Sequence, residues 1–283
     1  MIVTRFAPSP TGLLHLGHAW SAVQAHDRAR RDGGSFLLRI EDIDGTRSRA
    51  DFIDAIAADL VWLGLTWDDA VVRQSARFDP YVVALERLQT LGLLYPCFCT
   101  RAEIAASLTA PHGDTPLYPG TCRYLDGAER ADRMAGEQHA WRIDMVAAAA
   151  RAGPLGWRDE LAGDVVGDPL SHGDVILARK DAPVSYHLAA TLDDAAQGIT
   201  HVVRGVDLFA ATHVHRLLQA LLDLPTPLYH HHALLIGADG TRLAKRHGAP
   251  TLAAMRDAGV DGRALADDLR AGRLPIGITL AQA

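Results

Sequence analysis

The stretch Pro8-Ser9-Pro10-Thr11-Gly12-Leu13-Leu14-His15-Leu16-Gly17-His18 decides the fold. It follows a short strand-like run, residues 2–6, and leads into a segment with helical spacing of apolar residues that ends before Gly33-Gly34. A strand, a loop rich in Pro and Gly, and a helix form the first half of a parallel β-α-β unit. The loop carries two imidazoles, His15 and His18, at the expected start of the helix.

This loop has the chemistry of an anion site. A helix start presents unpaired backbone N–H groups and the positive end of the helix dipole. Gly17 lets a flat ring or a phosphate approach the backbone closely. The loop therefore predicts a triphosphate site, although spacing alone leaves open an ordinary loop with two exposed histidines. The chain contains neither a Gly-x-x-x-x-Gly-Lys-Ser/Thr loop nor a Gly-x-Gly-x-x-Gly loop, so the site is neither a P-loop nor a dinucleotide fingerprint.

The alternation of strands and helices continues to about residue 95 and resumes after residue 184. We therefore expect an α/β protein with a Rossmann-type doubly wound parallel sheet and an inserted smaller α+β domain that carries a zinc site. The expected parts are the first half of a nucleotide-binding catalytic domain at 1–95, the inserted domain at 96–184, the second catalytic half at 185–246, and a short C-terminal helical segment at 247–283.

Composition excludes several classes of protein. Of 283 residues, 48% are hydrophobic and 22% are charged, which is typical of a globular chain and not of a disordered or fibrous one. No apolar run reaches the ~20 residues of a membrane helix, and the first residues do not form a secretory signal. The net charge of −6 argues against a general polyanion binder, so nucleic acid would have to meet a local basic face. We expect a cytoplasmic monomer without membrane contact.

A second basic segment, Thr241-Arg242-Leu243-Ala244-Lys245-Arg246, follows an expected strand and a Gly-Ala-Asp-Gly turn. A mobile basic loop at the carboxyl end of a parallel strand can cover phosphates and stabilise charge that develops between them. Lys180 and Lys245 are the only lysines among 28 basic residues. Because a compact ammonium differs from a guanidinium at a phosphate, Lys245 favours a functional loop over a solvated basic turn.

Together these two segments resemble the His-Ile-Gly-His and Lys-Met-Ser-Lys-Ser signatures of class I aminoacyl-tRNA synthetases. The runs 5–12, 38–44 and 201–207 are similar to motifs of the glutamyl branch, so five ordered motifs span residues 5 to 246. Arg242 and Ala244 depart from the family, which has a lysine and a serine there. The resemblance implies ATP with Mg²⁺ as substrate, His15, His18 and Lys245 as catalytic residues, and an ATP site made of His15, Gly17, His18, Arg242 and Lys245.

An amino-acid pocket is also indicated by residue chemistry. A side-chain carboxylate is best held by planar guanidinium groups, and Arg5 and Arg204 come from separate strands that could converge. Glu41, at the end of the 36–40 strand, is a candidate partner for an α-ammonium, and Tyr186 would add a hydroxyl. A surface salt bridge is the alternative for either arginine alone. The resemblance implies a pocket for L-glutamate lined by Arg5, Phe6, Ala7, Pro8, Ser9, Glu41, Tyr186 and Arg204.

The three cysteines lie close together, as Cys97-Phe98-Cys99 and Cys122. A structural zinc needs four ligands, so a fourth must join the three thiolates. Tyr118 and His112 are the candidates, and three thiols without a metal are the alternative. Glutamyl-queuosine enzymes and some glutamyl synthetases have Cys-x-Cys followed by Tyr-x-x-x-Cys. This resemblance favours one structural Zn²⁺ held by Cys97, Cys99, Tyr118 and Cys122.

The chain ends soon after the second basic segment, without room for the connecting region and anticodon-binding domain of a glutamyl-tRNA synthetase. With the cysteine pattern, this makes the sequence resemble the glutamyl-queuosine tRNA(Asp) synthetases. That family implies a ligase that activates L-glutamate with ATP to glutamyl-adenylate, without tRNA, and transfers glutamate to the cyclopentenediol of queuosine at the wobble position of tRNA(Asp). The alternatives are a truncated glutamyl-tRNA synthetase that charges the tRNA 3′ end and a catalytically silent binding protein on the same scaffold.

Overall fold

A parallel sheet forms the centre of the molecule. The computed structural model describes residues 1–100, 103, 117–241, 243 and 250–281. The strands of this sheet are β1 (Val3–Phe6), β2 (Ser35–Ile40), β3 (Val72–Arg73), β9 (His201–Gly205) and β10 (Leu228–His232). The backbone N–H of Thr200 donates to the carbonyl of Val3 at 3.0 Å, which places β9 next to β1. The pairs β1–β2, β2–β3 and β9–β10 are parallel, and the strands lie in the order β3-β2-β1-β9-β10.

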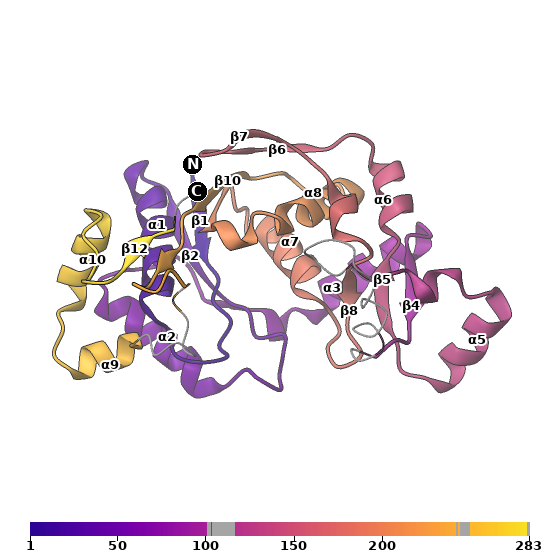
Figure 1. Ribbon diagram of the computed structural model, residues 1–283, viewed down its shortest axis with the longest axis horizontal. Coiled ribbons are helices and arrows are strands. Elements are labelled where there is room, and N and C mark those ends of the chain that lie inside the picture. The colour runs from indigo at the N-terminus through magenta and orange to yellow at the C-terminus, as the bar shows by residue number, and fades with distance from the viewer. Residues whose placement is uncertain (101–102, 104–116, 242, 244–249, 282–283) are drawn as a thin grey trace.

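Helices cover both faces of this sheet, which confirms the predicted doubly wound α/β fold (Figure 1). The helices α1 (Leu16–Arg31) and α2 (Ala50–Trp62) lie on one face, and α7 (Tyr186–Ala196) and α8 (Ala211–Leu221) lie on the other. Phe36, Leu38 and Ile40 of β2 pack into the core beneath α1 and α2, while Leu37 packs into a separate cluster. Since side chains alternate along a strand, the fully buried Arg39 shares the face of Leu37 and needs a partner there.

A smaller antiparallel sheet lies at the end of the molecule opposite α9 and α10 (Figure 1). Its strands are β4 (Leu94–Cys97), β5 (Ala140–Ile143) and β8 (Ile176–Ala178), and nearby helices are α3 (Phe78–Thr90), α5 (Gly127–Gly136) and α6 (Met145–Ala152). Short 3₁₀ helices occupy Gln74–Ala76, Thr121–Tyr124, Pro169–His172 and Val206–Leu208.

The β-hairpin of β6 (Gly156–Asp159) and β7 (Gly163–Val166) falls inside the range expected for the inserted domain. It does not join the small sheet. Instead β6 pairs in parallel with β10, where Asp159 lies opposite Tyr229. Residues 96–184 therefore contribute strands to two different sheets, which the spacing of sequence motifs did not reveal.

The C-terminal segment returns to the start of α1. Its elements are β11 (Leu235–Ile236), which pairs with β12 (Thr279–Leu280), and the helices α9 (Leu252–Asp257) and α10 (Gly262–Arg270). The Leu252 N–H donates to the Leu14 carbonyl at 2.9 Å, and Thr251 forms a β-bridge with His15. Among the helices of the described ranges, none combines the length and apolar character needed to span a membrane.

Gly262 begins α10 where a side chain has no room. A Cβ atom there would lie 2.4 Å from the backbone oxygen of Trp62 and 2.5 Å from its ring carbon Cδ2. We predict that Gly262→Ala lowers the free energy of unfolding by about 1–3 kcal/mol, measured by urea denaturation. Gly127→Ala is the matched control, because Gly127 also follows an aspartate N-cap and meets nothing within 4 Å. Equal losses in both variants would contradict the role of the Trp62 contact.

Candidate active site

One cavity lies at the carboxyl ends of the parallel strands, beside the point between β1 and β9 where the sheet order reverses. Ligands of open α/β sheets bind at this point. The cavity measures about 430 Å³. It brings together all the predicted amino-acid and nucleotide residues that the structure describes, namely Arg5, Phe6, Ala7, Pro8, Ser9, His15, Gly17, His18, Glu41, Tyr186 and Arg204. The other two predicted nucleotide residues, Arg242 and Lys245, lie outside the described residues, and Leu243 between them lines the cavity.

The two imidazoles cap the start of α1 reciprocally. The ring nitrogen Nδ1 of His15 accepts from the Gly17 N–H, and Nδ1 of His18 accepts from the His15 N–H, each at 3.1 Å. The ring centroids of the two histidines are 3.9 Å apart. The backbone donors that the sequence predicts for a phosphate are therefore engaged by the imidazoles, and the two rings form this part of the cavity wall.

Gly17 makes the capping geometry possible. A Cβ atom at this position would lie 3.0 Å from Cε1 of the His15 ring. The close approach that glycine allows is thus used by His15 and not only by a ligand. Trp20, one turn further along α1, donates its ring N–H to the carbonyl of Ala233 at 3.1 Å and ties the helix to the end of β10.

Arg204 is buried at the end of β9 and has partners in every direction. Its Nε donates to Nε2 of His231 at 3.0 Å. Its Nη2 donates to the hydroxyl of Thr212 at 2.7 Å and to the Leu208 carbonyl at 3.1 Å. Its Nη1 donates to the Tyr186 hydroxyl at 3.2 Å. Because these bonds occupy most of its five N–H groups, a bidentate grip by Arg204 on a carboxylate would require one of them to open.

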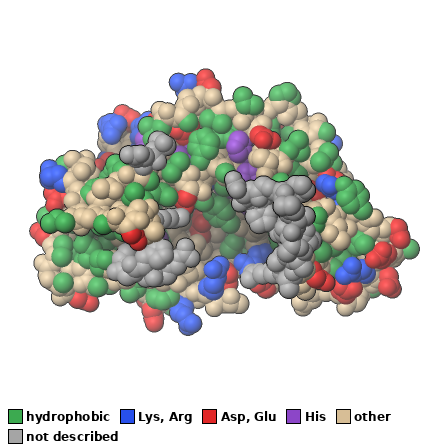
Figure 2. Space-filling view, viewed as in Figure 1, with side chains coloured by type: hydrophobic (Ala, Val, Ile, Leu, Met, Phe, Trp, Pro, Cys, Tyr) green, Lys and Arg blue, Asp and Glu red, His purple; other side chains and the backbone are tan. Residues whose placement is uncertain are grey.

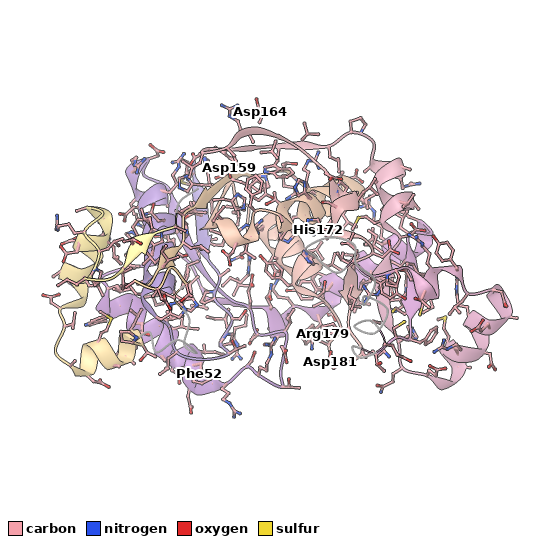
Figure 3. All side chains as sticks on the ribbon, viewed as in Figure 1. Phe52, Asp159, Asp164, His172, Arg179 and Asp181 are labelled. Carbon is pink, nitrogen blue, oxygen red and sulfur yellow. The ribbon has the colours of Figure 1, made fainter. Side chains whose placement is uncertain are left out.

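Two consequences follow for the residues around Arg204. The Tyr186 hydroxyl accepts from Arg204, so its own hydrogen is left to donate to another acceptor in the cavity. Asp159, labelled in Figure 3, lies at the end of β6. Its carboxylate is 2.7 Å from Nδ1 of His231, on the side of the ring opposite Arg204. The β6–β7 hairpin therefore contributes indirectly to the placement of the Arg204 guanidinium.

Arg5 is held by Asp194 of α7. Its Nε and Nη2 donate to the two carboxylate oxygens of Asp194 at 2.8 and 3.2 Å. The remaining nitrogen, Nη1, makes only a long contact of 3.5 Å with the Val203 carbonyl. Nη1 is accordingly the part of this guanidinium best able to receive an anion from the cavity.

Arg39 joins Asp194 to Glu41. It is fully buried and donates to Asp194 at 2.7 Å and to Glu41 at 3.2 Å. Burial by itself would raise the pKa of Asp194, but the charges of Arg5 and Arg39 lower it to about 2. Burial raises the pKa of Glu41 above its usual value, against the opposing charges of Arg39 and Arg5. A cation in the cavity would favour the ionised form of Glu41.

Asp194 and Arg39 were not among the residues that sequence reasoning selected. The signal for Arg39 is a charged residue inside the apolar run 36–40, which a buried strand tolerates only with a counter-charge. The signal for Asp194 is weaker, since Asp193 and Asp194 stand on a helix without a recognisable motif. Only the fold shows which of the two aspartates faces Arg5.

The cysteine cluster lies beside the small sheet, with the three Sγ atoms within 4.8 Å of one another. The sulfurs of Cys99 and Cys122 are 3.5 Å apart, and the Tyr118 hydroxyl lies 3.5 Å from Cys97 Sγ and 3.5 Å from Cys99 Sγ. A tetrahedral zinc with bonds of ~2.3 Å to sulfur and ~2.0 Å to oxygen requires S–S edges of about 3.8 Å and S–O edges of about 3.5 Å. The Cys99–Cys122 separation and the two S–O separations are close to these edges, so the three thiols and the Tyr118 phenol could hold a zinc ion. His112, the other candidate, lies outside the described residues.

Arg142 is a further part of this cluster that the sequence did not indicate. Its Nε donates to Cys97 Sγ at 3.2 Å, and its guanidinium lies 3.8 Å from the centroid of the Tyr118 ring. Lys180, one of the two lysines, donates to the carbonyl of Phe98 at 2.6 Å. These cations are placed where they would partly offset the negative charge of deprotonated metal ligands.

Residues 1–271 match the family described as "tRNA synthetases class I (E and Q), catalytic domain". The chain belongs to this family. It is therefore a ligase of the aminoacyl-tRNA synthetase type, and ATP is a substrate of the class.

Proteins similar to this chain are named either glutamyl-Q tRNA(Asp) synthetase or glutamate-tRNA synthetase. A "Glutamyl-Q tRNA(Asp) synthetase" from Rhodobacter capsulatus is 47% identical over 271 residues, 91% of this chain and 96% of that protein. One of the same name from Symbiobacterium thermophilum is 46% identical over 92% of this chain and 82% of that protein. Among solved structures, a glutamate-tRNA synthetase from Elizabethkingia anophelis superimposes with a TM-score of 0.82 at 27% identity. This chain covers 61% of that structure.

The lowered pKa values of two buried histidines predict how the stability of this synthetase depends on pH. Burial lowers the pKa of His187 to about 4, helped by the charges of His172 and Arg204, and burial with Arg204 likewise lowers that of His231 to about 4. Because the unfolded chain binds protons that the folded one excludes, we predict that unfolding free energy falls as pH drops from about 6.5 to about 4. Each such histidine contributes up to about 1.4 kcal/mol per pH unit in that window.

His187→Gln tests this prediction, since the variant lacks one of the titrating rings. Urea denaturation between about pH 7.5 and pH 4.5 should give a shallower decline for the variant, by close to one proton. Parallel curves for the variant and the unsubstituted chain would show that His187 does not titrate on unfolding.

Proposed function

We propose that this synthetase activates L-glutamate with ATP and transfers it to the cyclopentenediol of queuosine at the wobble position of tRNA(Asp). The observation that carries the proposal is the similarity to proteins named Glutamyl-Q tRNA(Asp) synthetase, which reaches 47% identity over 91% of this chain and 96% of the Rhodobacter protein. The cavity supports it with groups of both signs, because an amino acid with an acidic side chain presents one ammonium and two carboxylates.

The amino acid would lie along the wall formed by residues 6–9. Its α-ammonium would donate to Glu41, which lines the cavity and accepts a hydrogen bond from Arg39. Its side-chain carboxylate would accept from Nη1 of Arg5 and from the Tyr186 hydroxyl, which Arg204 orients. Neutral glutamine would leave this donor pair without a negative charge to bind, which disfavours it.

The nucleotide would occupy the side of the cavity formed by His15, Gly17 and His18. We assign the basic sequence segment with Arg242 and Lys245 to its phosphates. An oxygen of the glutamate α-carboxylate attacks the α-phosphorus in line, the bond from the α-phosphorus to the oxygen that bridges it to the β-phosphorus breaks, and pyrophosphate leaves. The imidazoles and Lys245 position phosphates and stabilise the charge that develops on them.

The second step forms an ester. A queuosine hydroxyl attacks the carbonyl carbon of the mixed anhydride, the bond to AMP breaks, and the hydroxyl proton passes to a phosphate oxygen of the leaving AMP. Transfer to the 3′-terminal adenosine of a tRNA is the other outcome that this chemistry allows. A monomeric state and a cytoplasmic location stay predictions from the sequence.

We also propose that Cys97, Cys99, Tyr118 and Cys122 hold one structural zinc. The fit of the S–S and S–O separations to a tetrahedron supports this assignment. The metal would tie the start of the segment after β4 to the 3₁₀ turn at Thr121–Tyr124, some twenty residues later, and would take no part in the chemical steps.

Glutamate activation and transfer can be measured separately. We predict that ATP–pyrophosphate exchange with L-glutamate proceeds without tRNA, and that radiolabelled glutamate is then attached to queuosine-containing tRNA(Asp) but not to queuosine-lacking tRNA(Asp). Removal of the 3′-terminal adenosine from the product should leave the label in place. Label lost with that adenosine would instead identify a glutamyl-tRNA synthetase, and exchange that begins only after tRNA is added would contradict tRNA-independent activation.

The metal proposal predicts one zinc per chain in the purified protein, measured by mass spectrometry of the native chain or by elemental analysis. Cys122→Ser should lower zinc retention against a chelator by at least about tenfold. Tyr118→Phe keeps the ring under Arg142 but removes the oxygen, so it should also weaken retention. Unchanged retention in Tyr118→Phe would exclude the phenol as the fourth ligand.

A further inference from the structure

Four buried side chains of alternating charge form a continuous row of ion pairs next to the cavity. Arg5 on β1 contacts Asp194 on α7, Asp194 contacts Arg39 on β2, and Arg39 contacts Glu41 just beyond β2. The closest N–O distances along this chain are 2.8, 2.7 and 3.2 Å. The four side chains are between 0% and 11% exposed, so solvent screens these contacts little.

The ends of this chain reach the cavity and the middle does not. Arg5 and Glu41 line the cavity, whereas Arg39 and Asp194 are absent from its wall. Arg39 has no exposed surface and is held additionally by Gln197, whose side-chain oxygen accepts at 2.9 Å. The inner pair therefore does not line the cavity, but it joins the two groups that do.

We propose that Asp194 and Arg39 are positioning residues that set the separation between Arg5 and Glu41 and thereby select an amino acid of the length of glutamate. The proposal rests on the proposed function, which assigns Arg5 and Glu41 to opposite ends of the amino acid. Aspartate is shorter by one carbon–carbon bond, about 1.5 Å. A site must hold its groups to within about 0.5 Å to read such a difference, so the groups need rigid support.

The geometry supplies this rigidity in three ways. The Asp194 carboxylate binds Arg5 through two parallel bonds, which fixes the plane of the guanidinium and leaves Nη1 outside this pair of bonds. Arg39 lies on a central strand between two paired neighbours, so it cannot shift without the sheet. Glu41 is anchored by its backbone too, since its N–H donates to the Pro8 carbonyl at 3.1 Å.

The preceding residue, Asp193, supplies a matched control. It is also buried, and it accepts from Gln74, Arg77 and Tyr81 at 2.8, 2.9 and 2.7 Å. None of those three donors lines the cavity. Asp193 thus holds the 3₁₀ helix η1 (Gln74–Ala76) and α3 in place, as Asp194 holds Arg5. Its loss should lower stability without changing the preference for glutamate over aspartate.

The experiment compares Asp194→Asn with Asp193→Asn in the full chain, by ATP–pyrophosphate exchange with L-glutamate and with L-aspartate. Asp194→Asn should raise KM for glutamate by about 10–100-fold, keep KM for ATP within about threefold, and lower the glutamate-over-aspartate ratio of kcat/KM by at least about tenfold. Asp193→Asn should keep all three within about threefold. Urea denaturation of both variants reports whether each is folded.

A milder variant keeps the test decisive if Asp194→Asn does not fold. Gln197→Ala removes one support of Arg39 and leaves the four charges in place, so KM for glutamate should rise by about 3–10-fold with KM for ATP unchanged. Equal effects of Asp193→Asn and Asp194→Asn, or an unchanged glutamate-over-aspartate ratio in both Asp194→Asn and Gln197→Ala, would overturn the proposal.

Failure of the proposed function gives different results. If glutamate is activated but no queuosine is modified, the transfer step is wrong and the KM comparison still decides the role of Asp194. If the unsubstituted chain neither exchanges pyrophosphate nor binds L-glutamate by calorimetry, the assignment of Arg5 and Glu41 is wrong and the positioning role fails with it.

Discussion

The carboxylate of Asp194, shared between two buried guanidinium groups, is the contact on which the site depends. A buried arginine is stable only beside a counter-charge, and here Arg5 and Arg39 come from adjacent strands and point toward the same helix. Asp194 therefore joins β1, β2 and α7, while Asp193 joins α7 to η1 and α3. Two neighbouring aspartates of α7 thus tie this helix to the strands beside the cavity and to the segment that leads into α3.

Other polar groups of the cavity are likewise bonded to neighbouring protein groups. The N–H groups of Arg204 donate to neighbouring protein groups, so Arg204 orients the Tyr186 hydroxyl and has little capacity left for a ligand. His15 and His18 accept hydrogen bonds from backbone N–H groups at the start of α1, and both residues line the cavity. Acidic and basic side chains are interspersed over the face in Figure 2, in keeping with the net charge of −6.

Local sequence patterns predicted much of this arrangement. The loop at 8–18 predicted a strand, a turn and a helix with His15 at its start, and α1 begins at Leu16 with His15 as its N-cap. The cysteine spacing predicted a cluster, and the three thiols lie together. These predictions succeed because the groups involved are close together in the chain. The β6–β7 hairpin, Arg142 beside Cys97, and Asp194 between two arginines were not predicted, because each pairs residues that no local pattern relates.

By itself the sequence determined the α/β class, the family of the chain, and a set of residues that line one cavity. Those properties follow from the period of apolar residues and from short motifs, which are local. The tertiary structure alone decided which donors remain available, since Arg5 retains one nitrogen for the cavity and Arg204 retains almost none. Hydrogen-bonding capacity is finite and is shared among neighbours that only folding brings together.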